Sequence, residues 1–134
     1  MLDVDQFKSI NDGYGHLAGD RALKEIAQRV EEKIRTMDTA ARFGGDELAI
    51  LLPDATAIDA GKLGERIRKA IESTPFVLTP QVKRRLTVSV GVASIAPGRG
   101  ESDLKALADR LLADADAALY RAKALGRNRV QLGA

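Results

Sequence analysis

The sequence predicts an α+β domain with a central, antiparallel-rich sheet flanked by helices. Three observations favour this fold class. Short apolar runs around a Gly-Gly pair predict a hairpin, several stretches show the helical spacing of apolar residues, and hairpins outnumber the segments that could serve as parallel crossovers. With 134 residues, of which 45% are hydrophobic, the chain is long enough for one domain with its own core.

Alternation and glycine content predict the first elements. Asp3 and Asp5 flank Val4, so in a strand both acids point away from Val4. Few apolar residues precede Asp3, and we expect this strand to begin upstream of the sequence. A short helical segment is predicted at residues 6–12, followed by a flexible glycine loop at 13–19.

A helix and a hairpin are predicted next. An amphipathic helix should run from Asp20 to about Arg35 or Met37, because apolar residues recur there at helical spacing. The hairpin that follows is centred on Gly44 and Gly45, where glycine supplies the freedom for positive φ in a tight turn.

Residues 57–73 predict another amphipathic helix, with Arg66 and Arg68 on its solvated edge. Two strands are then predicted at 76–79 and 86–94, joined by a polar stretch, and an edge strand is predicted at 128–132. Between them a long helix should end at Gly126. The buried stripe of this helix is predicted to consist of Leu104, Leu107, Leu111, Leu112, Ala115 and Leu119.

Composition narrows the classes of function. The formal net charge is +2 and only 4% of residues are aromatic, which argues against a base-stacking nucleic-acid binder and a polybasic membrane binder. The chain has no cysteine and a single histidine, so disulfides and the usual zinc sites are excluded. No apolar run is long enough to span a bilayer. We expect a cytoplasmic domain that contacts neither nucleic acid nor membrane.

Three acidic residues are expected to meet at the hairpin. If the first strand lies beside it, Asp3 converges with Asp46 and Glu47, and carboxylates so close repel one another unless a cation lies between them. Oxygen-only ligands favour a hard ion such as Mg²⁺, completed by substrate phosphates. Singly, an acidic turn and solvated cations are ordinary surface features, but together they predict metal-assisted phosphoryl or nucleotidyl transfer. The cations that could reach phosphates are Lys8, Lys123 and Arg127.

Five segments follow one another in a distinctive order. They are Asp3-Val4-Asp5-x-Phe7-Lys8-x-Ile10-Asn11-Asp12, Gly15-His16-x-x-Gly19-Asp20, Arg42-Phe43-Gly44-Gly45-Asp46-Glu47, Ser89-Val90-Gly91-Val92-Ala93 and Ala117-x-Leu119-Tyr120-x-Ala122-Lys123-x-x-Gly126-Arg127-Asn128. In this order the chain resembles the GGDEF domain, the diguanylate cyclase family. The resemblance covers almost the whole chain and implies a fold similar to nucleotidyl cyclase and polymerase palm domains.

The resemblance implies that two molecules of GTP are joined into cyclic di-GMP with release of pyrophosphate. The reaction would need Mg²⁺ or Mn²⁺ and a two-fold homodimer, because each subunit holds one GTP and each 3′-hydroxyl attacks the other's α-phosphorus. By resemblance, the metal ligands are Asp3, the Val4 carbonyl and Asp46, the catalytic residues are Asp46, Glu47 and Lys8, and the substrate-binding residues are Asn11, His16, Asp20, Gly44, Gly45, Lys123 and Arg127.

A further segment, Arg35-Thr36-Met37-Asp38, matches the family's Arg-x-x-Asp site for product inhibition. Arg66 falls where a second arginine of that allosteric site is found. The alternative is a local ion pair between Arg35 and Asp38. Because arginine suits guanine edges and phosphates, product binding is favoured.

Two features depart from the family's pattern. Leu48 stands where the hairpin motif has Phe, and because this position stays apolar we expect function to be retained. The single domain at residues 1–134 is also expected to lack the helix and most of the first strand that family domains carry before Asp3. Three interpretations remain open: an active cyclase, a weak or inactive regulatory domain that binds GTP or cyclic di-GMP, and a structural interaction domain.

Overall fold

The computed structural model describes residues 1–133. A five-stranded sheet has the strand order β2-β3-β1-β6-β7, and β4 and β5 form a separate two-stranded sheet. In chain order the elements are β1 (Leu2–Val4), α1 (Phe7–Tyr14), α2 (His16–Glu31), β2 (Thr39–Arg42), β3 (Glu47–Leu51), α3 (Ala57–Ser73), β4 (Phe76–Thr79), β5 (Val82–Arg84), β6 (Val88–Val92), α4 (Leu104–Ala124) and β7 (Val130–Leu132).

Strand β1 lies at the centre of the large sheet and is antiparallel to both of its neighbours. Leu2 is opposite Leu48 of β3 and Val90 of β6. β2 pairs with β3 in the predicted hairpin, and β7 adds to β6 in parallel. This antiparallel-rich sheet flanked by helices confirms the predicted fold class.

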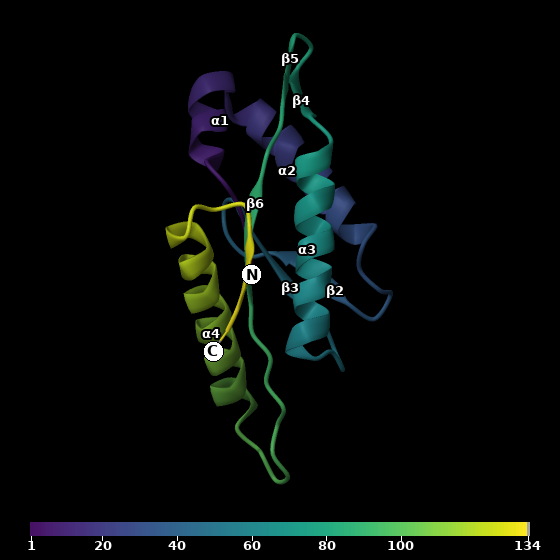
Figure 1. The fold of residues 1–134 in the computed structure, drawn as a ribbon, viewed down its shortest axis with the longest axis vertical. Helices are drawn as coiled ribbons and strands as arrows, with labels where there is room; N and C mark the ends of the chain where they lie inside the picture. The colour runs from purple at the N-terminus through teal and green to yellow at the C-terminus, as the bar shows by residue number, and fades with distance from the viewer. Residues whose placement is uncertain (134) are drawn as a thin grey trace.

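Helices α3 and α4 lie on opposite faces of this sheet (Figure 1). Val90 lies against Gly64 of α3, whereas a Cβ added to Gly91 would be 2.2 Å from the carbonyl oxygen of Ala115 in α4. Neighbouring residues of a strand point to opposite faces, which places the two helices on different sides. Glycine at position 91 is therefore what allows α4 to approach the sheet so closely.

The main hydrophobic core lies on the α3 side of the sheet. Leu48 belongs to this core, in agreement with the apolar packing expected of it. Burial of such side chains is the main stabilising contribution to the fold. The largest fully buried apolar side chains are Leu2, Val4, Ile10, Ile26, Val30, Ile67, Ile71, Phe76, Leu78 and Val88.

The predicted glycine loop at 13–19 is wrong, because most of it is helical. α1 runs to Tyr14 and α2 begins at His16, so the chain changes direction at Gly15, with φ of 88°. Glycine reaches this left-handed conformation without steric cost, and one residue is enough to separate the two helices.

Helix α2 ends earlier than predicted, at Glu31 instead of near Arg35 or Met37. The reason lies in Asp38, whose carboxylate accepts a hydrogen bond from the backbone N–H of Arg35 (2.8 Å). Such a side-chain bond offers the backbone an alternative to the helix and favours a turn.

The second half differs from prediction in several places. β6 covers only Val88–Val92 of the strand predicted at 86–94, and β7 begins at Val130 instead of residue 128. The polar stretch after β4 contains β5, which pairs with β4 apart from the main sheet. The long helix α4 and the left-handed glycine after it, Gly126 (φ 115°), are confirmed. Its predicted stripe is wrong at Leu104 and Leu112, which are 71% and 39% exposed, while Ala118 and Ala122 are buried.

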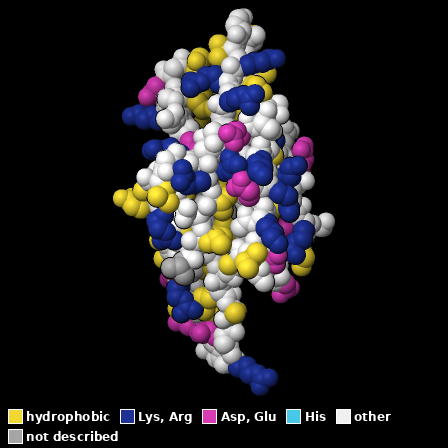
Figure 2. All heavy atoms as spheres, viewed as in Figure 1, with side chains coloured by type: hydrophobic (Ala, Val, Ile, Leu, Met, Phe, Trp, Pro, Cys, Tyr) yellow, Lys and Arg dark blue, Asp and Glu magenta, His cyan; other side chains and the backbone are white. Residues whose placement is uncertain are grey.

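The surface mixes charges of both signs. Lys and Arg side chains alternate with Asp and Glu over the face drawn in Figure 2, in keeping with the net charge of +2. Among residues 1–133, no helix has the length and apolar character needed to cross a membrane.

Candidate active site

Asp3 lies directly opposite Glu47 in the antiparallel pairing of β1 with β3. The N–H of Val4 donates a hydrogen bond to the carbonyl oxygen of Asp46 (3.1 Å), which strengthens the same junction. Asp3 is buried, with 5% of its surface exposed, and Asp46 and Glu47 are half-buried. The pairing of these strands therefore brings the three acids together, although more than forty residues of sequence separate Asp3 from the other two.

Burial and charge set the state of this cluster. Burial raises the pKa of Asp3 to about 6, and the neighbouring Asp46 carboxyl adds to this effect. Lys123 of α4 acts in the opposite direction through an ion pair with Asp3. Burial disfavours the charge on Lys123, but its bond to Asp3 and the charges of Asp46 and Glu47 outweigh burial and raise its pKa. The site thus joins a buried carboxylate, Asp3, to a half-buried one, Asp46, with Lys123 as the positive partner of Asp3.

The donor set fits a hard divalent cation. Two carboxylates that repel each other provide oxygen ligands of the kind that Mg²⁺ or Mn²⁺ prefers. Over residues 1–133, no three or more His, Cys, Asp or Glu side chains come close enough to hold a metal ion by themselves. A cation bound by Asp3 and Asp46 would therefore need further oxygens, which backbone carbonyls and substrate phosphates can supply.

Arg42 holds the hairpin turn from one side. Its guanidinium group donates hydrogen bonds to the carbonyl oxygens of Gly44 (3.1 Å) and Gly45 (2.8 Å). The prediction of positive φ at these two glycines is wrong, since the described glycines with positive φ are at other positions. Gly45 instead leaves open space, because an added Cβ would have no atom within 4 Å. A ligand can therefore approach the backbone of the turn.

The residues predicted to bind guanine lie at the contact between α1 and α2. A Cβ added to Gly19 would lie 2.0 Å from the side-chain oxygen of Asn11, so only glycine lets Asn11 lie against α2. Asp20 follows Gly19 and is exposed, and His16 is exposed at the first position of α2. Because residues four apart share one side of a helix, His16 and Asp20 lie on the same surface.

The predicted cations do not all gather at the acids. Lys123 contacts Asp3, whereas Lys8 is exposed in the first turn of α1 and Arg127 is exposed in the turn after α4. Asp5 anchors the turn after α4, because its carboxylate accepts a hydrogen bond from the backbone N–H of Asn128 (3.0 Å). This role of Asp5 was not predicted from the sequence.

A second charged cluster lies around Arg35 and Asp38. The guanidinium group of Arg35 donates to the Asp38 carboxylate (2.8 Å) and to the carbonyl oxygen of Pro53 (2.8 Å). The hydrogen bonds that Arg35 donates to Asp38 hold the pKa of this carboxyl below its usual range. Arg66 of α3 lines the same small cavity, of about 190 Å³. The predicted ion pair thus exists, and a second arginine shares its cavity.

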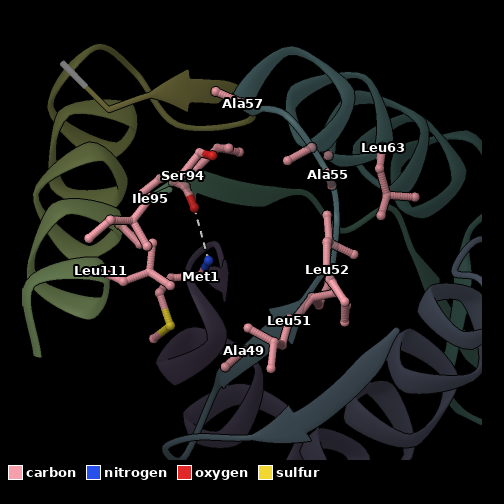
Figure 3. A pocket seen from close by; sticks show the side chains of 18 of the residues that line it. Met1, Ala49, Leu51, Leu52, Ala55, Ala57, Leu63, Ser94, Ile95 and Leu111 are labelled. Atoms are coloured by element: carbon pink, nitrogen blue, oxygen red, sulfur yellow. Dashed lines mark hydrogen bonds between the residues drawn. The ribbon is translucent and has the colours of Figure 1, made fainter. Parts of the chain in front are cut away.

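An apolar cavity of about 950 Å³ lies between β3 and the segment that follows β6 (Figure 3). Met1 is at its edge, where its backbone nitrogen donates to the carbonyl oxygen of Gly91 (2.9 Å). Leu52 and Ile95 flank the space from opposite sides in Figure 3. The cavity thus continues the line of β1 between its two neighbouring strands.

Comparison with known proteins identifies the family. Residues 1–129 match the family described as "Diguanylate cyclase, GGDEF domain", and the chain belongs to this family. Diguanylate cyclase A of Treponema denticola is 42% identical to this chain in an alignment that covers 98% of the chain. The chain spans only 34% of the length of that relative.

Solved GGDEF domains share the fold. A chain of TpbB (YfiN) from Pseudomonas aeruginosa comprising only the GGDEF domain has a TM-score of 0.86 and 36% identity, over 99% of this chain and 74% of that chain. The GGDEF domain of DgcB from Caulobacter crescentus, in complex with cyclic di-GMP, has a TM-score of 0.85 and 34% identity, over 98% of this chain and 74% of that chain. The predicted family and fold are confirmed.

Proposed function

We propose that this domain is the catalytic part of a diguanylate cyclase, which joins two GTP molecules into cyclic di-GMP and releases pyrophosphate. The main support is the position of buried Asp3, opposite Glu47 and beside Asp46, at an open glycine turn. Membership of the family described as "Diguanylate cyclase, GGDEF domain" supports the same reaction.

In this proposal Asp3, the Val4 carbonyl and Asp46 hold Mg²⁺ or Mn²⁺. The ion supplies charge neutralisation at the triphosphate. Lys123, already placed at Asp3, and Arg127 in the following turn bind phosphate oxygens through charge-assisted hydrogen bonds. Their positive charges also favour the negative charge that develops during phosphoryl transfer.

The chemical step is assigned to the hairpin acids. Asp46 and Glu47 together organise the metal and assist deprotonation of the attacking 3′-hydroxyl, whose proton passes to one acid of the pair, and Lys8 stabilises the negative charge of the transition state. A carboxylate that accepts hydrogen bonds from guanine N1 and N2 discriminates against adenine, because one polar group would then stay unpaired. The residues proposed to bind guanine and to let the nucleotide approach the backbone are Asn11, His16, Asp20, Gly44 and Gly45.

A two-fold homodimer is part of the proposal. Each domain offers one acidic cluster and one guanine surface, whereas the product joins two nucleotides, so two domains must face each other. A cytoplasmic setting follows from the substrate, because GTP is an intracellular nucleotide. Cyclic di-GMP is also proposed to bind at Arg35, Asp38 and Arg66 and to inhibit the enzyme. The complex of DgcB with cyclic di-GMP supports product binding by a GGDEF domain.

The apolar cavity beyond Met1 is proposed to take residues that precede it in the full-length protein. An extended segment there would continue β1 and pair with both β3 and the chain after β6, as an added strand does in β-augmentation. The length of the TpbB GGDEF-only chain, of which this chain covers 74%, supports a longer complete domain.

The test is incubation of the full-length protein with GTP and Mg²⁺, followed by nucleotide chromatography. Cyclic di-GMP should form, and Glu47→Ala should reduce the rate at least about 100-fold, as expected when the acid pair that assists proton transfer is broken. Glu101→Ala, which changes an exposed acid before α4, should keep the wild-type rate. GTP binding without product would support a regulatory domain instead. Absence of both would support a structural interaction domain.

A further inference from the structure

The turn that follows α4 has an unusual backbone. Gly126, Arg127 and Asn128 have φ values of 115°, 63° and 46°, so three consecutive residues are in the left-handed region. Glycine adopts this conformation freely, but a residue with a Cβ adopts it at a cost in free energy. Contacts from the rest of the fold are therefore needed to keep the turn in this shape.

Asn128 makes these contacts through its backbone and through its side-chain amide. Its N–H donates to Oδ2 of Asp5 (3.0 Å). Its Oδ1 accepts from the Arg68 guanidinium group (2.8 Å), and its Nδ2 donates to Oε1 of Glu72 (3.2 Å). This amide orientation satisfies both a cationic donor and an anionic acceptor. Asn128 thus ties the turn both to the residue after β1 and to α3.

Asp5 is itself firmly held. Its carboxylate accepts hydrogen bonds from the hydroxyl groups of Thr87 (2.7 Å) and Ser89 (2.7 Å), and its N–H donates to the Thr87 carbonyl oxygen (3.0 Å). Only 8% of its surface is exposed. Because Asp5 follows Asp3 by two residues, one short segment carries both the acid of the active site and the anchor of the turn.

Arg68 of α3, which donates to Asn128, is itself held by two acidic residues of the same helix. The side chain of Arg68 is 13% exposed and forms ion pairs with Glu65 and Glu72, each at 2.6 Å. The expectation that Arg68 lies on a solvated edge is therefore wrong. Linked, partly buried hydrogen bonds of this kind restrict their members to one geometry.

We propose that Asn128 is a positioning residue, which holds the turn so that Arg127 faces the phosphates of a nucleoside triphosphate bound at Asp3. The inference rests on the proposed function, because it takes Arg127 as a phosphate-binding group. Asn128 itself does not touch the nucleotide. It acts through the conformation of the turn and through the fixed distance between the turn and Asp5.

A double-mutant cycle tests this inference on the full-length protein. The measurement is the Kd of a non-hydrolysable GTP analogue in the presence of Mg²⁺. Asn128→Gly keeps the left-handed backbone accessible but removes the bonds to Arg68 and Glu72. Alone it should weaken binding at least about tenfold, the scale of one hydrogen bond to a charged group. In an Arg127→Ala background the same change should alter the Kd less than about twofold, because the group that it positions is gone.

Glu65→Gln is the matched control. It removes one ion pair of Arg68 but none of the hydrogen bonds of Asn128, and it should leave the Kd within about twofold of wild type. Equal losses from Asn128→Gly with and without Arg127 would overturn the inference. So would an unchanged Kd in Arg127→Ala, or a loss in Glu65→Gln as large as that in Asn128→Gly. Binding is measured without turnover, so absence of cyclic di-GMP formation would refute only the proposed function.

Discussion

Gly19 of α2 lies directly against the side chain of Asn11 in α1. A Cβ at position 19 would be 2.0 Å from the Asn11 oxygen and 3.0 Å from the ring of Phe7. Contacts that short cannot exist, so the two helices approach closely only because residue 19 has no side chain. The contact also sets the position of Asn11 relative to Asp20, the next residue of α2.

Gly19→Ala should therefore damage both stability and nucleotide binding. Overpacking at this contact should lower the free energy of unfolding by about 1–3 kcal/mol. Displacement of Asn11 should raise KM for GTP about tenfold, the scale of one lost hydrogen bond. Urea unfolding and initial-rate kinetics measure the two effects. Gly13→Ala is the control, since an added Cβ there meets no atom within 4 Å, and it should leave KM unchanged.

Asp3→Asn should abolish activity without weakening the fold. Loss of a charged metal ligand should reduce turnover at least about 100-fold, because metal-assisted charge stabilisation is worth several kcal/mol. Burial and the nearby Asp46 carboxyl already raise the pKa of Asp3 to about 6, so its charge is unfavourable in the folded protein at neutral pH. The urea midpoint in EDTA at pH 7 should therefore be unchanged or higher. Retained activity would exclude Asp3 as a ligand.

Arg35→Ala should relieve product inhibition. The side chain holds Asp38 and lines the cavity that also contains Arg66, so its removal takes away donors for guanine or phosphate groups. The concentration of cyclic di-GMP that halves the rate should rise at least about tenfold, as expected for loss of a charged hydrogen bond. Arg21→Ala, an exposed arginine of α2, should behave as wild type. Unchanged inhibition in Arg35→Ala would mean that this cluster is only an ion pair.

The stability of the domain should depend on Asp38 in acid. Hydrogen bonds from Arg35 lower its pKa from the ordinary 3.8. A carboxyl with a lowered folded pKa contributes stability above its unfolded value and loses that contribution as the pH falls through the folded value. The difference in unfolding free energy between wild type and Asp38→Asn should thus be largest at neutral pH and shrink below about pH 4. Urea unfolding at several pH values measures it, and a constant difference would contradict the assignment.

Features that depend on neighbouring residues were predictable from the sequence. Helix α3 has the predicted bounds, 57–73, and its start is fixed locally, because the hydroxyl of Thr56 accepts a hydrogen bond from the N–H of Asp59 (3.1 Å). The place of Asp3 beside the hairpin was predicted only on the condition that the first strand pairs there, because that pairing joins Asp3 to Glu47 across the assembled sheet.

Features that depend on the assembled fold were not predictable. The spacing of Arg68 and Glu72 indicates an ion pair along α3, but the bond from Arg68 to Asn128 joins residues 60 positions apart. The bond from Asn128 to Asp5 spans 123 positions. No periodicity in the sequence reports such contacts, because they arise only when α3, β1 and the turn after α4 pack together. The short glycine turn at Gly15 was missed for a different reason, since glycine content alone does not separate a one-residue turn from a loop.

The central place of β1 has a practical consequence for any fusion at Met1. An extended chain advances about 3.3 Å per residue, so the first residue of an attached segment would lie less than about 15 Å from the Asp3 carboxylate. A displacement or rotation of the backbone at Met1 would therefore be transmitted along β1 to Asp3, the proposed metal ligand, over only two residues. A segment attached at Met1 would also have to pass the apolar cavity that Met1 lines.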